Sequence, residues 1–160
     1  MDGAPVELRT ERLRLRRWRH GDRAALAALN ADPEVMEFLP GALTRQESDE
    51  MMDRLAESFD SRGFGLWAVE VTATTTFVGW SGLWPATFAA HFTPAVEVGW
   101  RLCRACWGRG YATEAARASV ADGFARLDLD EIVSFTTADN RRSRRVMEKL
   151  GMSHDPADDF

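Results

Sequence analysis

Trp107-Gly108-Arg109-Gly110-Tyr111 is the stretch that decides the fold, because it stands between a predicted strand and a predicted helix. The residues before it, Val96 to Leu102, are expected to form the strand. Tyr111 to Arg126 follow and are expected to form the helix, since apolar residues recur there at every fourth position. These residues are Ala112, Ala116, Val120 and Phe124. We call residues 107–113 the glycine turn.

A turn of this kind attracts anions. The first amides of a helix have no partner within the helix, the helix dipole is positive there, and glycine lets a ligand approach the backbone closely. A Walker-type phosphate loop is excluded because Tyr111 and Ala112 follow Gly110 where Lys and Ser/Thr are required. The dinucleotide fingerprint is excluded because Thr113 stands where Gly or Ala is required. On spacing alone, ordinary tight-turn glycines remain the alternative.

The first part of the chain is predicted to form a strand and two helices. Leu8 to Leu15 alternates leucine with arginine towards its end, which is typical of a half-buried strand. Asp22 is expected to cap a short helix. Thr44 and Glu47 have the spacing of a capping box, in which a hydroxyl and a carboxylate satisfy free amides at a helix start. A longer helix should follow and end at Gly63.

The remaining segments complete a sheet. Leu66 to Val71 and Phe77 to Leu83 are β-rich runs joined by a threonine-rich stretch, which predicts an antiparallel hairpin. Ile132 to Thr136 predicts a last strand, parallel to the strand before the glycine turn. Asn140 to Leu150 predicts a last helix that ends at Gly151. The expected fold class is α/β (α+β), with a mixed, mostly antiparallel sheet flanked by helices.

Length and composition favour one domain over residues 1–160, since 45% of the residues are hydrophobic and can build one core. The net charge of −5 argues against nonspecific nucleic-acid or anionic-membrane binding, because both reward a basic face. Lys149 is the only lysine, and the abundant arginine suits phosphate or carboxylate ligands. No segment approaches the roughly 20 apolar residues of a membrane span, and residues 1–5 lack signal-peptide features. We therefore expect a cytoplasmic protein.

The two cysteines, Cys103 and Cys106, have a spacing that suits redox chemistry or half of a zinc site. The second half of a zinc site is missing, because the three histidines are scattered without paired-ligand spacing. We expect structural or incidental cysteines and no metal.

Three ordered blocks of the chain resemble the GNAT superfamily of acetyltransferases. They are residues 96–102 (VEVGWRL), 107–115 (WGRGYATEA) and 140–152 (NRRSRRVMEKLGM). The closest branch is the ribosomal-protein N-terminal acetyltransferases (RimJ/RimL-like), which residues 8–16 (LRTERLRLR) also resemble. The resemblance implies the GNAT fold and an N-acetyltransferase that uses acetyl-CoA and a primary amine. That amine would be a peptide N-terminus or a small molecule.

The resemblance also implies where the cofactor lies. In the family, the strand before the glycine turn splays from its parallel neighbour, and pantetheine lies in the opening, where Val98 and Trp100 would face it. Asn140 and Ser143 would approach the pantetheine and the thiol. The pyrophosphate would bind the glycine turn at Gly108, Arg109, Gly110, Tyr111, Ala112 and Thr113.

This chain departs from the family pattern at two positions. Ala105 replaces a Gln or Arg before the glycine turn, so the backbone must hold the phosphates without that side chain. Met147 replaces a Tyr that serves many members as the general acid. By similarity to the ribosomal-protein branch, Ser143 is expected to protonate the leaving thiolate instead.

Direct transfer of an acetyl group to an amine needs a base, a donor to the thioester oxygen and an acid. Glu97 on the splayed strand is the candidate base, and the alternative is a glutamate paired with one of the arginines. A backbone amide near Val98 or Gly99 is the candidate oxyanion donor. An α-amine, with a pKa of about 7.7 to 8.0, asks less of the base than a lysine, with a pKa of about 10.4.

Two other functions remain compatible with the sequence. One is a noncatalytic acyl-CoA sensor on the same fold, and the other is a thiol redox protein.

Family members usually carry two more strands after the last helix, so the strand at Ile132 would lose its neighbour. An unpaired apolar edge invites association, and we expect either a shortened chain or strand exchange within a homodimer.

Overall fold

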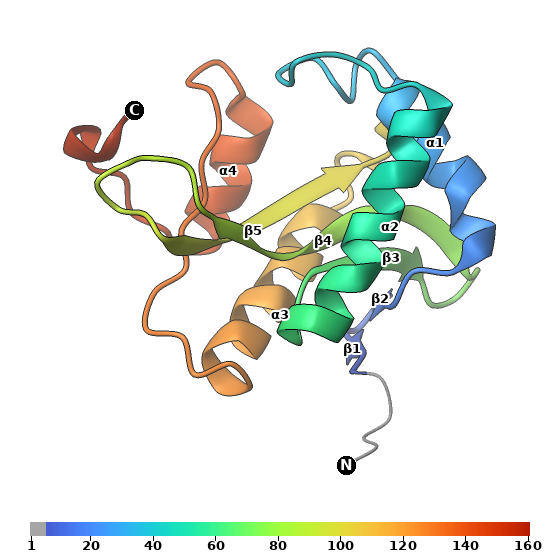
Figure 1. The fold of residues 1–160 in the computed structure, drawn as a ribbon, viewed down its shortest axis with the longest axis horizontal. Helices are drawn as coiled ribbons and strands as arrows, with labels where there is room; N and C mark the ends of the chain where they lie inside the picture. The colour runs from blue at the N-terminus through green and yellow to red at the C-terminus, as the bar shows by residue number, and fades with distance from the viewer. Residues whose placement is uncertain (1–5) are drawn as a thin grey trace.

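The computed structural model describes residues 6–160, and its centre is a five-stranded antiparallel sheet whose strands follow chain order (Figure 1). The expectation for residues 1–5 lies outside the described residues. The strands are β1 (Leu8–Arg9), β2 (Leu13–Arg16), β3 (Leu66–Val71), β4 (Thr76–Ala86) and β5 (Ala95–Leu102). The helices are α1 (Arg23–Ala31), α2 (Arg45–Arg62), α3 (Tyr111–Ala125) and α4 (Arg141–Lys149), with short 3-10 turns at His20–Asp22, Arg104–Cys106 and Pro156–Asp158.

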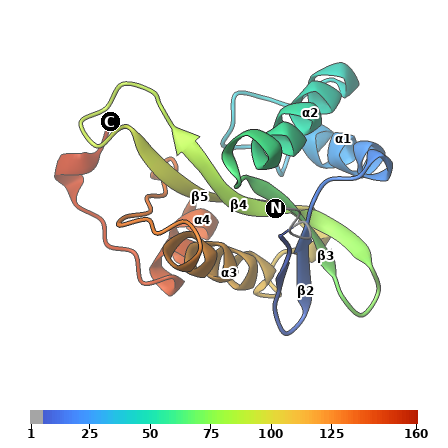
Figure 2. The ribbon, with the colours of Figure 1, turned by 60° about the horizontal axis from the view of Figure 1, so that its bottom comes forward.

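The sheet is covered on both faces. Figure 2 shows α1 and α2 on one side of the strands and α3 and α4 on the other. Large apolar residues from β2, α1 and α2 fill the first core, among them Leu15, Leu26 and Leu55, all almost fully buried. A second buried cluster, around Leu83, Val98 and Ala116, packs β4 and β5 against α3, so apolar burial stabilises the sheet on both faces.

Helix α3 lies on the sheet through small residues, which corrects the predicted apolar face. Its buried side chains include Ala115, Ala116 and Ser119, whereas Phe124 is 46% exposed. At Gly123 an added Cβ would meet the δ-methyl carbons of Leu83 and Ile132 at 2.8 Å. Because α3 lies so close to the sheet, only small residues fit on its buried face. The spacing of the large apolar residues therefore predicted the wrong face of the helix.

The predicted capping box of α2 is confirmed. The Glu47 amide donates to Thr44 Oγ1 at 3.1 Å, and the Thr44 amide donates to Glu47 Oε2 at 2.8 Å. Gly63 ends the helix with φ 79°, a left-handed conformation that glycine adopts without strain. The β3–β4 hairpin is also confirmed, and β4 continues three residues past the predicted end to Ala86.

The prediction of one strand over Leu8 to Leu15 is wrong, because the chain turns back between β1 and β2. Leu8 pairs with Leu15 across the turn. Glu114 of α3 holds the turn: its carboxylate accepts from Thr10 Oγ1 at 2.6 Å and from Arg12 Nε at 2.8 Å. A partner so distant in sequence leaves no local signal.

The predicted strand Ile132 to Thr136 shrinks to a single parallel bridge between Glu97 and Val133. The Val98 amide donates to the Val133 oxygen at 2.8 Å, and the Val133 amide donates to the Val96 oxygen at 2.9 Å. The parallel direction is as predicted. Beyond this bridge the edge of β5 is not paired with another strand in the described part of the chain, so this part of the edge is open.

Asp22 does not cap α1, contrary to the prediction. Its carboxylate accepts two hydrogen bonds from the guanidinium of Arg16 and one from the Arg19 amide, at 2.8 to 2.9 Å. A buried arginine competes successfully for the carboxylate because two charge-assisted bonds are stronger than one cap.

Candidate active site

The glycine turn forms a cradle of free amides. Gly108 and Gly110 have φ of 77° and 82°, which any other residue would adopt only with strain. The first helical bond of α3 runs from the Glu114 amide to the Gly110 oxygen at 3.0 Å. Among the described residues, the amides from Gly108 to Thr113 find no hydrogen-bond acceptor. Six consecutive free donors at the positive end of a helix suit a diphosphate.

Stacked arginines hold the glycine turn in place. The Trp107 indole donates to the Leu102 oxygen at 3.0 Å, which ties the turn to the end of β5. The guanidinium of Arg142 lies over the Trp107 ring at 4.2 Å, and that of Arg104 at 4.8 Å. Because Arg142 belongs to the first turn of α4, this contact brings the start of α4 to the glycine turn.

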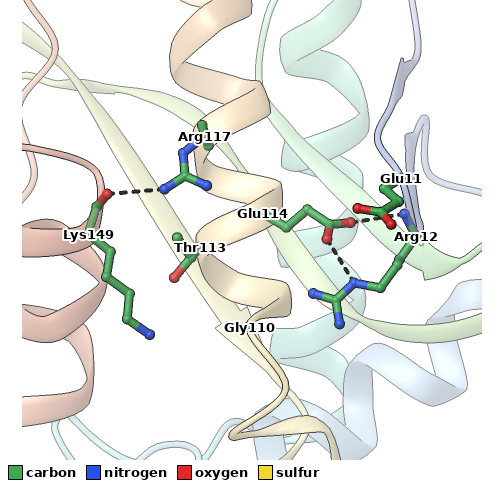
Figure 3. A pocket seen from close by; sticks show the side chains of 7 residues that line it. All are labelled: Glu11, Arg12, Gly110, Thr113, Glu114, Arg117 and Lys149. Carbon is green, nitrogen blue, oxygen red and sulfur yellow. Dashed lines mark hydrogen bonds and ion pairs between the residues drawn. The ribbon is translucent and has the colours of Figure 1, made fainter.

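A pocket of about 420 Å³ opens beside the glycine turn (Figure 3). Thr113 and Arg117 of α3 form one wall, and the Lys149 side chain extends towards them from the end of α4. The Arg117 guanidinium donates to the backbone oxygen of Lys149 at 3.1 Å. Neither cation has a carboxylate partner among residues 6–160, since Glu114 is engaged by Arg12. The lining residues are Glu11, Arg12, Gly110, Thr113, Glu114, Arg117 and Lys149.

The β5 edge next to this cradle presents the Trp100 amide. The Val98 amide donates to the Val133 oxygen, and its oxygen accepts from Ser134 Oγ at 2.9 Å. Gly99 faces its register partner Gly82 in β4. Alternate residues of a strand direct their amides to the same side. The Trp100 amide therefore points, like that of Val98, away from β4 and towards the open edge of β5. The Val98 amide is thus bonded to Val133, and the expected oxyanion donor near Val98 or Gly99 stays a prediction.

Glu97 is a half-buried carboxylate without a partner. It forms no ion pair with any described residue, so the alternative of a structural glutamate–arginine pair is wrong. Desolvation by burial raises the pKa of Glu97 to about 7. A carboxylate with a pKa near neutrality, next to an open strand edge, has the properties of a general base.

Asn140 and Ser143 lie together at the start of α4. Asn140 caps the helix, and its Oδ1 accepts from the Ser143 amide at 3.2 Å. Ser143 is partly exposed, and Met147 lies one turn further along the same helix. The Asn140 oxygen is thus committed to the cap, which leaves its amide hydrogens for a ligand.

The cysteines are free thiols in contact with each other. Burial and a hydrogen bond to Cys103 raise the pKa of Cys106 to about 12. No cluster of three His, Cys, Asp or Glu residues suited to a metal occurs within residues 6–160. In the same part of the chain, each helix is too short or too polar to cross a membrane.

Sequence reasoning missed several residues of this region. The Thr10–Arg12–Glu114 contacts and the pairing of Arg117 with Lys149 depend on tertiary packing and have no local signature. Arg101 was missed although a signal existed: it lies on the same face of β5 as Glu97 by strand alternation.

Comparisons with known proteins agree with this geometry. Residues 12–153 match the family model described as Acetyltransferase (GNAT) domain. The chain is 32% identical over 152 residues to "Uncharacterized protein YkkB" of Bacillus subtilis (strain 168), covering 94% of this chain and 87% of that protein. It is 34% identical over 158 residues to "FsC-acetyl coenzyme A-N(2)-transacetylase" of Aspergillus fumigatus, covering 94% and 66%. The crystal structure of an acetyltransferase from Agrobacterium tumefaciens superposes with a TM-score of 0.84 at 29% identity, covering 98% and 88%.

Proposed function

The chain belongs to the GNAT acetyltransferase family and is an acetyl-CoA-dependent N-acetyltransferase, and from this premise we propose that its acceptor is the α-amine of a peptide or protein N-terminus. The observation that carries the proposal is the unpartnered Glu97 carboxylate with its pKa near 7. The resemblance of three sequence blocks to the ribosomal-protein branch supports the same acceptor.

The residues present fit acetyl-CoA, which supplies the acetyl group as an activated thioester. We propose that the free amides of Gly108, Arg109, Gly110, Tyr111, Ala112 and Thr113 hold the pyrophosphate. Val98 and Trp100 would border the pantetheine, together with Asn140 and Ser143 from α4. The absence of a side-chain ligand at Ala105 is offset by the six free amides.

Glu97 is matched to an α-amine. Transfer of a proton from an α-ammonium with a pKa near 8 to a carboxylate with a pKa of about 7 costs about 1.4 kcal/mol. The same transfer from lysine, with a pKa of about 10.4, costs about 4.6 kcal/mol. The difference of about 3 kcal/mol corresponds to more than a hundredfold in rate. A peptide N-terminus is therefore the better acceptor.

Two further groups would complete the chemistry. The Trp100 amide would donate to the thioester oxygen, where negative charge develops during attack. The Ser143 hydroxyl would protonate the leaving thiolate, since Met147 has no proton to give. Both groups sit on rigid elements, a strand and the first turn of a helix.

Glu97→Gln tests the base. Because burial raises the pKa of Glu97 to about 7, the carboxyl is protonated below that pH and can accept a proton only above it. We expect the wild-type kcat/KM for a peptide acceptor to rise with pH through about 7. At pH 8 the variant should be about a hundredfold slower, and below pH 6 the two proteins should converge.

Thermal stability provides the control for folding. An acid with a raised folded-state pKa loses stability as pH rises from its unfolded value towards 7, and Gln removes that loss. Glu97→Gln should therefore melt higher than wild type at pH 8 and equally at pH 4. A rate ratio that is the same at every pH would refute Glu97 as the base.

Lys149→Met tests the outer part of the cofactor site. Lys149 and Arg117 are free cations in the pocket beside the glycine turn, and we propose that they contact the 3′-phosphate of CoA. The KM for acetyl-CoA should rise about tenfold in the variant, whereas the KM for 3′-dephospho-acetyl-CoA should not change. Equal effects on both compounds would place the phosphate elsewhere.

We also propose that the chain forms a homodimer through the edge beyond β5. Phe160 stacks on Phe88 at 5.0 Å and contacts Phe135 at 5.7 Å, and all three rings stay partly exposed. Exposed aromatic surface favours association. Light scattering should give the mass of a dimer for wild type and of a monomer for Phe135→Asp. A monomeric wild type would reject the proposal.

A further inference from the structure

Three residues of β5 point to the face of the sheet that α1 and α2 cover: Glu97, Gly99 and Arg101. The register between β4 and β5 is unbroken along this stretch, so side chains alternate strictly. Val98 faces the opposite side, where it packs with Ala116 of α3. On the α1 side, the Arg101 guanidinium reaches Asn30 of α1. Glu97 and Arg101 thus lie on the same face of β5, on either side of Gly99, against which the Trp80 ring packs.

Arg101 is a partly buried cation that has no carboxylate partner among residues 6–160. Its one hydrogen bond to a described residue is from Nη1 to Asn30 Oδ1 at 2.6 Å, although a guanidinium carries five donors. Desolvation lowers the pKa of Arg101 to about 10. The contrast with Arg16 is informative, because that buried guanidinium pairs with both Asp22 and Glu70. A buried charge normally has such partners, so Arg101 has unused capacity for an anion.

Trp80 supplies a second unused donor next to Arg101. It is the register partner of Arg101 in β4, and the guanidinium lies over its ring at 4.9 Å. Trp80 is 8% exposed, and within the described residues its Nε1 is the one buried side-chain nitrogen or oxygen without a hydrogen-bond partner. The other end of the ring lies against Gly99. Unpartnered buried donors are rare in folded proteins. Trp80 Nε1 and the remaining donors of Arg101, which makes one hydrogen bond, therefore point to a ligand oxygen.

We propose that Arg101, assisted by Trp80, binds a carboxylate carried by the acceptor, whose amine lies at Glu97. Four residues along a strand span roughly 13 Å. An extended peptide covers about 3.3 to 3.6 Å per residue. The acceptor is therefore a peptide with a carboxylate up to about four residues from its α-amine. Arg101 would repel polyamines and aminoglycosides, which carry only positive charge.

The inference rests on the proposed role of Glu97, and the experiment separates the two. We would titrate Ala-Ala-Ala, as the free acid and as the C-terminal amide, into the CoA-saturated protein by calorimetry. Wild type should bind the free acid at least tenfold more tightly than the amide. Arg101→Gln should lose this preference, Arg101→Lys should keep part of it because Lys retains charge without the planar fork, and the exposed control Arg54→Gln should keep it all.

Each result decides one of the two claims. Equal affinity for acid and amide in wild type, no binding of either at millimolar concentration, or a preference that survives in Arg101→Gln would overturn the carboxylate site. Preferential binding of the acid without any acetylation would leave the carboxylate site standing and reject Glu97 as base. Acetylation of the amide by Arg101→Gln at saturating peptide, at the wild-type kcat, would show that Arg101 sets KM. If Arg101→Gln does not fold, the affinities for the acid and the amide are compared between wild type and Arg101→Lys instead.

Discussion

Gly110→Glu is expected to abolish saturable binding of acetyl-CoA. Gly110 precedes α3 with φ 82°, and its neighbours present their amides to the ligand. The introduced carboxylate would place a negative charge among these donors and would repel a pyrophosphate by about 3 to 4 kcal/mol at about 4 Å. The Kd measured by calorimetry should rise at least a hundredfold.

Gly110→Ala is the matched control. An added Cβ meets only Arg12 Nη2, at 3.4 Å, so alanine fits the space. Its left-handed backbone costs roughly 1–2 kcal/mol of stability, a cost that both variants share. Binding within about fivefold of wild type by the alanine variant would assign the loss to charge and bulk. Tight binding of acetyl-CoA by a folded Gly110→Glu protein would remove the glycine turn from the cofactor site.

Arg16→Met is expected to lower the free energy of unfolding by about 3–5 kcal/mol. Arg16 binds Asp22 through two nitrogens and Glu70 through Nε at 2.9 Å, and the three side chains are only 5–8% exposed. Removal of the guanidinium leaves Asp22 with only the hydrogen bond from the Arg19 amide and Glu70 with only the longer contact to Arg14 Nη1 at 3.4 Å. The melting temperature should fall by roughly 10 °C.

The adjacent Arg17→Met provides the control. Arg17 pairs with Asp60, whose side chain is 75% exposed, so the loss should stay below about 1 kcal/mol. Burial alone would raise the pKa of Asp22, but its hydrogen bonds from Arg16 and Arg19 outweigh burial and hold that pKa below its usual value. The network therefore stabilises above about pH 4 and loses this contribution as pH falls. A penalty for Arg16→Met as small as that for Arg17→Met would contradict the assignment.

Local signals in the sequence predicted most of the fold. The Thr44–Glu47 capping box, the Gly63 helix end and the β3–β4 hairpin depend on neighbouring residues, and all three form as expected. The glycine turn lies between β5 and α3 as expected. Local patterns predict these features correctly because each feature depends on one side chain or one backbone angle of the residues that form it.

The predictions of secondary structure are wrong where a residue distant in the sequence determines the local structure. The first strand breaks because Glu114 binds Thr10 and Arg12 across the molecule. Asp22 leaves the helix cap because Arg16 competes for its carboxylate. The strand at Ile132 pairs only at Val133, although its β-branched composition is sufficient for more. Residue propensities carry no information about such long-range partners.

For the candidate site, too, some features were predictable from the sequence and others depend on packing. The resemblance of the sequence blocks predicted which residues would hold the cofactor, and it made Glu97, on the strand before the glycine turn, the candidate base. The lack of a partner for Glu97, the commitment of the Val98 amide to Val133 and the unpaired Arg101 became visible only with the packed structure. Whether a polar group has a hydrogen-bond or ion-pair partner depends on the residues packed around it, and no local sequence pattern encodes those residues.

The most direct measurement uses a peptide that carries both a free α-amine and one lysine. The protein is incubated at pH 7.5 with acetyl-CoA and this peptide, and fragmentation in a mass spectrometer locates the added acetyl group. An acetyl group on the α-nitrogen, with none on the lysine, is the result that the pKa of Glu97, about 7, predicts. Acetylation of the lysine alone, or of neither amine by a folded protein that binds acetyl-CoA, would contradict the proposed α-amine acceptor.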